Sequence, residues 1–136
     1  MKELKIEAKV ENLNKVLMFV DEQLEEMDCP MKTQLQIDIA VEEIYVNIAR
    51  YAYHPESGMV SIQVAFEKEP LSVILSFTDQ GIPYDPLAKA DPDITLSAEE
   101  RQIGGLGIFM VKKSMDHVCY EYKNGSNILT LKKGLL

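Results

Sequence analysis

The segment from Pro30 to about Tyr53 carries the longest helical pattern in the chain and constrains the fold most strongly. One apolar stripe along it consists of four residues at helical spacing, Ile37, Val41, Ile44 and Ile48. A second stripe, offset around the helix axis, consists of Leu35, Ile39 and Val46. We expect both stripes to be packed against other elements, and the remaining side, with Asp38 and Glu42, to face solvent.

Two polar residues interrupt this apolar pattern. Glu43 and Asn47 lie between the two stripes, about 40° apart around a helix of roughly 3.6 residues per turn. A carboxylate and an amide that face inward are costly to bury without partners. We therefore expect the pair to line a cavity that a polar group fills. The alternative is structural: Glu43 pairs with Arg50 or a strand lysine, and Asn47 binds a loop carbonyl.

The rest of the chain divides into short elements. Alternation of apolar and charged residues predicts a strand over residues 4–10, and helical spacing predicts a helix over 16–24, capped by Asn12 or Asn14. Four further strands are expected at 59–67, 71–78, 117–123 and 127–133, with a hairpin turn at Asn124-Gly125. A loop at 84–103 precedes a short helix that ends near Asp116. This order predicts an α+β two-layer sandwich with helices on one face of a mostly antiparallel sheet, as a single domain over residues 1–136.

Two glycine-containing motifs stand at element boundaries. Asp79-Gln80-Gly81 ends an apolar strand, where it is either an ordinary turn or a ligand contact. Gly104-Gly105-Leu106-Gly107 opens a helix, where it is either a hinge or an anion-binding loop whose N–H groups converge at the positive end of the helix. The spacing does not match a dinucleotide-binding G-x-G-x-x-G loop or a Walker A loop.

Charge and composition exclude several classes of protein. The 136 residues include 14 Lys and Arg against 22 Asp and Glu, a formal net charge of −8. General affinity for nucleic acid or anionic lipid is therefore not expected, since both depend on Lys and Arg. No apolar run approaches the roughly 18 residues that span a bilayer, and the N-terminus lacks the apolar region of a signal peptide. Cys29 and Cys119 have no metal-binding spacing. We expect a soluble cytoplasmic protein.

Taken together, the motifs resemble the GHKL nucleotide-binding fold, also called the histidine-kinase-like ATPase domain. Within it they are most similar to the anti-sigma-factor serine kinases of bacterial partner-switching systems. The segment Glu43-Ile-Tyr-Val-Asn47 resembles the N-box, and Asp79-Gln-Gly81 the first glycine box. The segment Gly104-Gly-Leu-Gly107 resembles the second glycine box. The resemblance covers nearly the whole chain and implies a mixed, mostly antiparallel sheet under three helices.

The resemblance also implies roles for these residues, with ATP and Mg²⁺ as ligands. Asn47 would bind Mg²⁺ through its amide oxygen, and Glu43 would be the catalytic base that accepts a proton from the attacking hydroxyl. Asp79 would bind the adenine amine, and Gly81 would let the backbone approach the base. The phosphates would be bound by the second glycine box, Gly104, Gly105, Leu106 and Gly107, with Arg101 at the γ-phosphate.

Some residues depart from the family pattern. Pro83 stands where many members have a further glycine, and Tyr51-Ala52 where His-Gly is common. A hydroxyl near adenine is expected from Ser126 or Thr130.

The resemblance implies a protein serine kinase that is also an anti-sigma factor. Its substrate would be a STAS-type anti-anti-sigma protein, with a sigma factor as a further partner and a homodimer as a possible assembly. The alternative from another class is a non-catalytic ATP-binding module that binds its partners according to nucleotide state. A third hypothesis, a domain with no nucleotide site, predicts that ATP leaves the melting temperature unchanged.

Overall fold

The computed structural model describes residues 1–88 and 105–135. The first half of the chain contains β1 (Lys2–Glu7), α1 (Leu13–Glu26) and α2 (Met31–Asn47). The hairpin β2 (Met59–Glu67) and β3 (Ser72–Asp79) follows, and then α3 (Gly105–Ser114), β4 (His117–Lys123) and β5 (Ser126–Gly134). These bounds confirm the predicted elements to within a few residues. Among the described residues, no helix is both long enough and apolar enough to cross a membrane.

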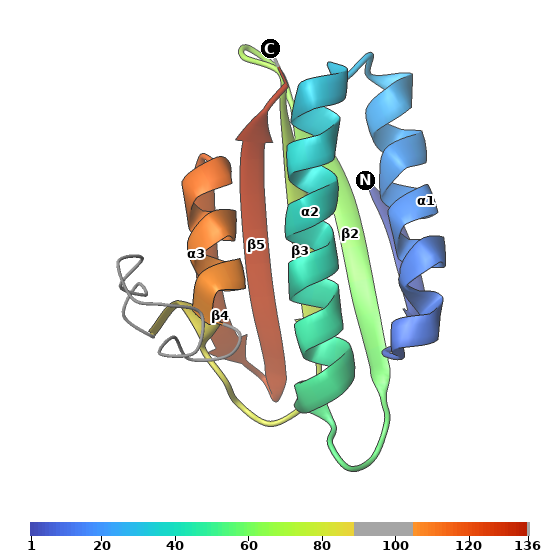
Figure 1. Ribbon diagram of the computed structural model, residues 1–136, viewed down its shortest axis with the longest axis vertical. Coiled ribbons are helices and arrows are strands. Elements are labelled where there is room, and N and C mark those ends of the chain that lie inside the picture. The colour runs from blue at the N-terminus through green and yellow to red at the C-terminus, as the bar shows by residue number, and fades with distance from the viewer. Residues whose placement is uncertain (89–104, 136) are drawn as a thin grey trace.

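The five strands form one sheet in the order β1-β2-β3-β5-β4, with every neighbouring pair antiparallel. The helices lie on one face of this sheet, so the expected α+β two-layer arrangement is confirmed (Figure 1). The mixed sheet that the family resemblance implied is wrong for these strands. The reason lies in the connections: α1 and α2 run in opposite directions between β1 and β2, so β2 re-enters the sheet antiparallel to β1 (Figure 1).

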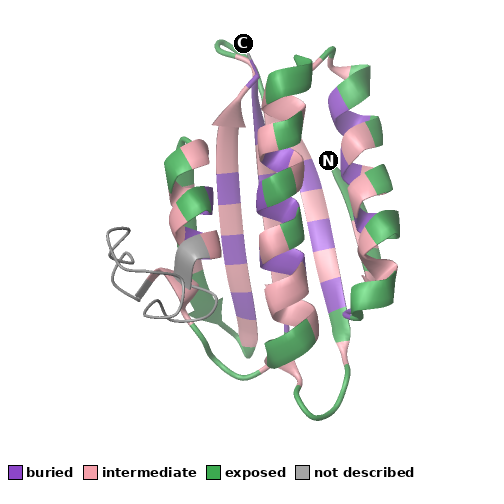
Figure 2. Ribbon diagram, in the orientation of Figure 1, coloured by how far each residue is buried: buried purple, intermediate pink, exposed green. Residues whose placement is uncertain are grey.

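The core lies between the sheet and the helices. Buried residues alternate with less buried ones along the central strands, as expected for a sheet that is covered on one face (Figure 2). The register aligns the buried residues across β2, β3 and β5 in rows, of which two are Ile62-Phe77-Leu129 and Val64-Leu75-Leu131. A third row, Val60-Asp79-Asn127, contains two buried polar residues at one end of the sheet.

Two local predictions at turns had different outcomes. Asn124 and Gly125 both have positive φ, 52° and 79°, which confirms the predicted tight turn between β4 and β5. Asn12 immediately precedes α1, but its side chain does not cap the helix. Its amide nitrogen instead donates a hydrogen bond to the carbonyl of Glu7 at 3.0 Å, because a single turn of 3₁₀ helix at Val10–Asn12 brings it back beside β1.

The helix predicted from Pro30 is confirmed, but its second apolar stripe is wrong. Leu35 and Ile39 are 55% and 61% exposed, while Asp38, expected in solvent, has a buried carboxyl oxygen. The physical reason is that α2 lies between α1 and α3 as well as over the sheet, so that only a narrow outer ridge stays exposed (Figure 1). Asp38 lies on the side that faces α1, and Leu35 and Ile39 lie on the ridge.

Candidate functional site

Glu43 and Asn47 lie at the C-terminal end of α2, and both side chains are partly buried. The amide nitrogen of Asn47 donates a hydrogen bond to Oε1 of Glu43 at 3.1 Å. This contact orients the amide, so its oxygen points away from the carboxylate and is left as an acceptor. Arg50 is exposed and forms no ion pair with Glu43 in the described structure, so the structural alternative based on that pair is wrong.

The N-terminal turn of α3 packs directly on Glu43. A Cβ atom added at Gly107 would overlap the carboxyl group of Glu43, so a side chain here would displace that carboxyl from its hydrogen bond with Asn47. Gly105 is the first residue of α3, and Leu106 follows in the same turn. The carboxylate of Glu43 therefore lies at the end of the helix where unpaired N–H groups and the dipole favour negative charge. Arg101 and Gly104, the other two residues predicted here, lie outside the described residues.

Asp79 is the last residue of β3, and only 4% of its surface is exposed. Its Oδ1 accepts hydrogen bonds from the N–H of Gly81 at 2.9 Å and from the side-chain nitrogen of Asn127 at 3.0 Å. No described residue donates a hydrogen bond to its second oxygen, Oδ2. A buried carboxylate at the end of an apolar strand, with one oxygen committed and one available, is arranged to accept a hydrogen bond from a ligand.

Gly81, just after β3, packs against the turn that follows α2. After Asn47 the helix widens into a π-helical turn at Ile48–Ala52, a feature often found at functional sites. The carbonyl of Ala52 in that turn accepts a hydrogen bond from the N–H of Ile82 at 3.0 Å. A Cβ atom at Gly81 would collide with the backbone of Ala52. The glycine is therefore required for packing between two chain segments, whatever contact it makes with a ligand.

Tyr53 and Asn127, which the sequence prediction missed, hold the loop that follows Asp79 in place. The Tyr53 hydroxyl donates to the carbonyl of Met59 at 2.6 Å and accepts from the N–H of Gln80 at 2.8 Å. Burial raises the pKa of Tyr53, so its hydroxyl stays protonated and remains a donor. Asn127 connects β5 to Asp79 and to the loop that follows it. The sequence did contain a sign of its role. Along β5, Leu131, Leu129 and Asn127 occupy successive buried positions that face the helices, and Asn127 is the one polar residue among these three.

The hydroxyl expected near adenine has a divided outcome. Thr130 lies on the face of the sheet away from the helices, where its hydroxyl is hydrogen-bonded to Ser76 at 3.3 Å. The prediction for Thr130 is therefore wrong, because strand alternation places even-numbered β5 residues on the open face. Ser126 has the same parity but is the first residue of β5, where its hydroxyl accepts a hydrogen bond from the side chain of Gln80 at 3.2 Å, so its place near adenine stays a prediction.

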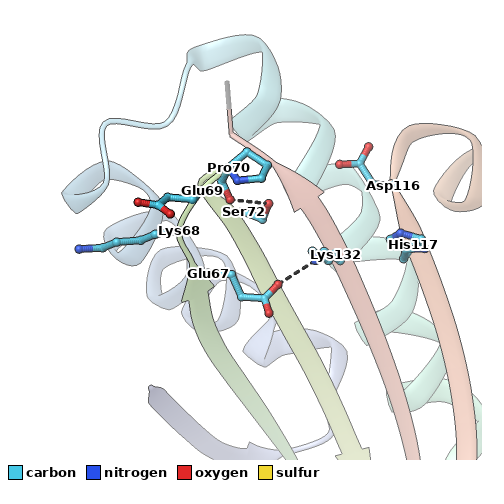
Figure 3. Close-up of a pocket in the computed structure, with 8 residues that line it drawn as sticks. All are labelled: Glu67, Lys68, Glu69, Pro70, Ser72, Asp116, His117 and Lys132. Atoms are coloured by element: carbon cyan, nitrogen blue, oxygen red, sulfur yellow. Dashed lines mark hydrogen bonds and ion pairs between the residues drawn. The ribbon is translucent and has the colours of Figure 1, made fainter.

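A separate polar pocket of about 550 Å³ lies at the other end of β3, roughly 24 Å away for an eight-residue strand (Figure 3). Its lining residues are Glu67, Lys68, Glu69, Pro70, Ser72, Asp116, His117 and Lys132. Several of these groups already bind one another. Lys132 and Glu67 form an ion pair at 2.7 Å, Ser72 donates to the Pro70 carbonyl at 3.3 Å, and Asp116 accepts from the N–H of Gly134 at 2.7 Å. We therefore assign the pocket a role in joining strand ends.

Comparison with known proteins identifies the family. The chain matches the family model described as the histidine kinase-like ATPase domain over residues 6–133. The serine/threonine-protein kinase BtrW of Bordetella bronchiseptica is 26% identical over 100 residues, which are 74% of this chain and 70% of that protein. The anti-sigma F factor of Clostridium acetobutylicum is 25% identical over 131 residues, 96% of this chain and 90% of that protein. The serine-protein kinase RsbW of Listeria monocytogenes is 29% identical over 101 residues, 71% of this chain and 63% of that protein.

A solved structure shares the fold. The crystal structure of the RsbU and RsbW domains of Rv1364c from Mycobacterium tuberculosis superimposes with a TM-score of 0.64 at 17% identity. The match covers 99% of this chain and 33% of that one. The fold, the named relatives and the family model agree, and they confirm the resemblance drawn from the motifs. The chain belongs to the histidine kinase-like ATPase domain family, a membership that implies an ATP-binding site.

Proposed function

We propose that this protein is a Mg²⁺- and ATP-dependent protein serine kinase that also acts as an anti-sigma factor. The observation that carries the proposal is the hydrogen-bonded pair of Glu43 and Asn47, which faces the first turn of α3. The printed names of its relatives, serine-protein kinases and an anti-sigma F factor, support the same assignment.

The proposed mechanism uses Glu43 as the general base. The hydroxyl oxygen of a substrate serine attacks the γ-phosphorus of ATP, and its bond to that phosphorus forms as the bond to the ADP oxygen breaks. The serine proton passes to the carboxylate of Glu43, which later releases it to solvent. The hydrogen bond from Asn47 to Oε1 restricts the rotamer of Glu43 and leaves Oε2 as the proton acceptor.

The residues present fit a magnesium ion in this site. Asn47 offers a neutral amide oxygen, and the described residues hold no group of three or more His, Cys, Asp or Glu that would form a metal cage. That is the donor set expected for Mg²⁺, which takes one or two protein oxygens and completes its shell with phosphate oxygens and water. When bound, the ion would neutralise charge that develops on the transferred phosphoryl group.

The phosphates are assigned to the start of α3. We propose that the N–H groups of Gly104, Gly105, Leu106 and Gly107 bind them, with the side chain of Arg101 at the γ-phosphate. The beginning of α3 at Gly105 and the absence of a side chain at Gly107 support this placement, since both leave backbone donors accessible next to Glu43. Asp79 is assigned to the adenine amine, through Oδ2, which accepts no hydrogen bond from the described residues.

The protein substrate is assigned to the STAS class of anti-anti-sigma proteins, and the second partner to a sigma factor. Two proteins that compete for one surface according to nucleotide state would explain why one domain has both activities. The proposal includes a homodimer as the functional assembly and a cytoplasmic location. The relatives' names support anti-sigma activity as a class.

The test is phosphate transfer from labelled ATP, in the presence of Mg²⁺, to a STAS protein from the same organism, with binding of sigma factor measured in parallel. Transfer to a serine, with loss of transfer in Glu43→Gln, supports the kinase. Nucleotide binding without transfer favours a non-catalytic ATP-binding module. A melting temperature unchanged by ATP contradicts both, because ligand at about 100 times its dissociation constant adds roughly 2.7 kcal/mol.

A further inference from the structure

Asn127 and Asp79 face each other at the end of the sheet where apolar residues would be expected. They are paired across β3 and β5, and they are 7% and 4% exposed. The equivalent positions further along the strands, Phe77-Leu129 and Leu75-Leu131, are buried and apolar. An amide and a carboxylate in such a row are stable only if they are hydrogen-bonded. The hydrogen-bond partners of Asp79 and Asn127 therefore indicate the function of this end of the sheet.

Every hydrogen-bonding group of the Asn127 side chain is already used within the protein. Its amide nitrogen donates to Oδ1 of Asp79 at 3.0 Å and to the carbonyl of Ile82 at 2.9 Å. Its amide oxygen accepts from the N–H of Tyr84 at 3.2 Å and from the hydroxyl of Tyr120. An asparagine has two N–H donors and two acceptor lone pairs, so none is left for a ligand. Asn127 therefore acts on a ligand only through the groups that it holds.

The group that Asn127 most directly controls is the carboxylate of Asp79. Oδ1 of Asp79 is bound by Asn127 and by the N–H of Gly81, so the carboxylate is fixed from two directions. A carboxylate only accepts hydrogen bonds, and these two hold its Oδ1 in place. Oδ2 therefore presents an acceptor in a fixed position. A base whose amine lies next to Oδ2 donates a hydrogen bond to it and is bound. A base with a carbonyl oxygen at that position places two hydrogen-bond acceptors against each other and is disfavoured.

We propose that Asn127 is a positioning residue that sets the base specificity of the nucleotide site. It holds Asp79 so that only a purine with an exocyclic amine at C6 fits. The inference rests on the proposed ATP site and adds to it the residue that makes the site selective. Removing Asn127 would free the carboxylate to rotate and would leave the loop carbonyl of Ile82 without its donor.

The test compares ATP with inosine triphosphate, which has a carbonyl in place of the C6 amine. Dissociation constants for both nucleotides are measured with Mg²⁺ by titration calorimetry, for the unmodified chain and for Asn127→Leu, which has similar volume but no polar atoms. We expect the unmodified chain to prefer ATP by about 100-fold, and Asn127→Leu to reduce that preference about tenfold. Asn127→Thr keeps one donor facing Asp79 and should recover part of the preference. It also provides the measurement if the leucine variant does not fold.

Thr130→Val is the matched control, because it removes a polar contact of the same strand on the opposite face. It should leave the preference unchanged. A purely structural role for Asn127 would weaken both nucleotides equally and preserve their ratio, and that result in the folded variants would overturn the inference while ATP binding stands. If the unmodified chain binds neither nucleotide, the proposed function itself fails.

Discussion

Two pairs of partly buried polar side chains involve helix α2, and they differ in how their hydrogen-bonding groups are satisfied. Near its middle, Asp38 faces Asp21 of α1, and each has a buried Oδ1 that accepts no hydrogen bond from a described residue. At its C-terminal end, Glu43 and Asn47 satisfy each other through one hydrogen bond. Two acids compete for the same donors, whereas an acid and an amide are complementary.

The two pairs therefore have different consequences. Burial, followed by the neighbouring carboxyl of Asp21 and the charge of Glu25, raises the pKa of Asp38 to about 8. Asp38 therefore holds a proton at neutral pH, which it can share with Asp21. In the Glu43–Asn47 pair, by contrast, one oxygen of each side chain accepts no hydrogen bond from the described residues. A partly buried polar pair thus indicates a ligand site when its groups complement each other and still have capacity to bind.

The largest expected effect separates catalysis from binding at Glu43. Glu43→Gln keeps the size of the side chain and an acceptor for Asn47 but removes the base. Phosphate transfer to the partner should fall about 10²- to 10⁴-fold, while ATP affinity changes less than about twofold. Glu42→Gln, at the exposed neighbouring position, is the control and should retain activity. A Glu43→Gln protein that transfers phosphate at the normal rate would rule out the proposed base.

Because α3 packs on Glu43, we expect Gly107→Ala to lower the free energy of unfolding, the opposite of the usual effect of this substitution in a helix. In an exposed helix position, glycine to alanine stabilises by about 1 kcal/mol. Here the added Cβ displaces the partly buried Glu43 carboxyl from its hydrogen bond with Asn47, so Gly107→Ala should destabilise the protein by about 1 kcal/mol in urea unfolding.

A double variant with Glu43→Ala should recover much of that loss, because it removes the carboxyl that the methyl group strikes. Gly134→Ala, where a Cβ atom would make an ordinary contact at 3.4 Å with Asp116, is the control. Stabilisation by Gly107→Ala would show that α3 does not rest on Glu43.

The acid pair predicts a pH dependence of stability. The folded state holds a proton on Asp38 up to about pH 8, whereas the unfolded chain releases it near pH 4. Unfolding therefore releases a proton between these values, and stability falls as pH rises through this window. Asp38→Asn should flatten the profile and stabilise the protein at pH 8 by about 1 kcal/mol, after allowance for solvent screening, or roughly 4 °C in melting temperature. An unchanged profile would mean that Asp38 does not titrate in this window.

The smallest effect is expected on the outer ridge of α2. Leu35→Gln and Ile39→Gln should each change the free energy of unfolding by less than about 0.5 kcal/mol, since both side chains are more than half exposed. Ile37→Ala, in the buried stripe of the same helix, should cost about 2–5 kcal/mol. Losses of that size at Leu35 or Ile39 would show that the ridge is buried, as in a homodimer.

The sequence predicted most of the fold because its signals are local. Strand alternation, the Asn124-Gly125 turn and the long helical pattern each depend on neighbouring residues. The error at Leu35 and Ile39 arose because helical spacing reports which residues are apolar, whereas the positions of α1 and α3 decide which are covered. The same limit applies to Asp38, whose burial depends on a residue in another helix.

The candidate site was predictable only in part. Glu43, Asn47 and Asp79 stood out because each breaks an apolar pattern along its own element. Asn127 and Tyr53 were missed because their importance comes from long-range contacts, to Asp79 across the sheet and to Gln80 across the loop. The packing roles of Gly81 and Gly107 likewise depend on residues of α2 and its following turn.

The most direct measurement is a crystal structure with Mg²⁺ and a non-hydrolysable ATP analogue. Our account predicts the ion at about 2.1 Å from Oδ1 of Asn47, and Oδ2 of Asp79 at about 2.9 Å from the adenine amine. The γ-phosphate should lie between Glu43 and the first turn of α3. A nucleotide bound elsewhere on the chain, with Glu43 and Asn47 in contact only with protein atoms, would contradict the account.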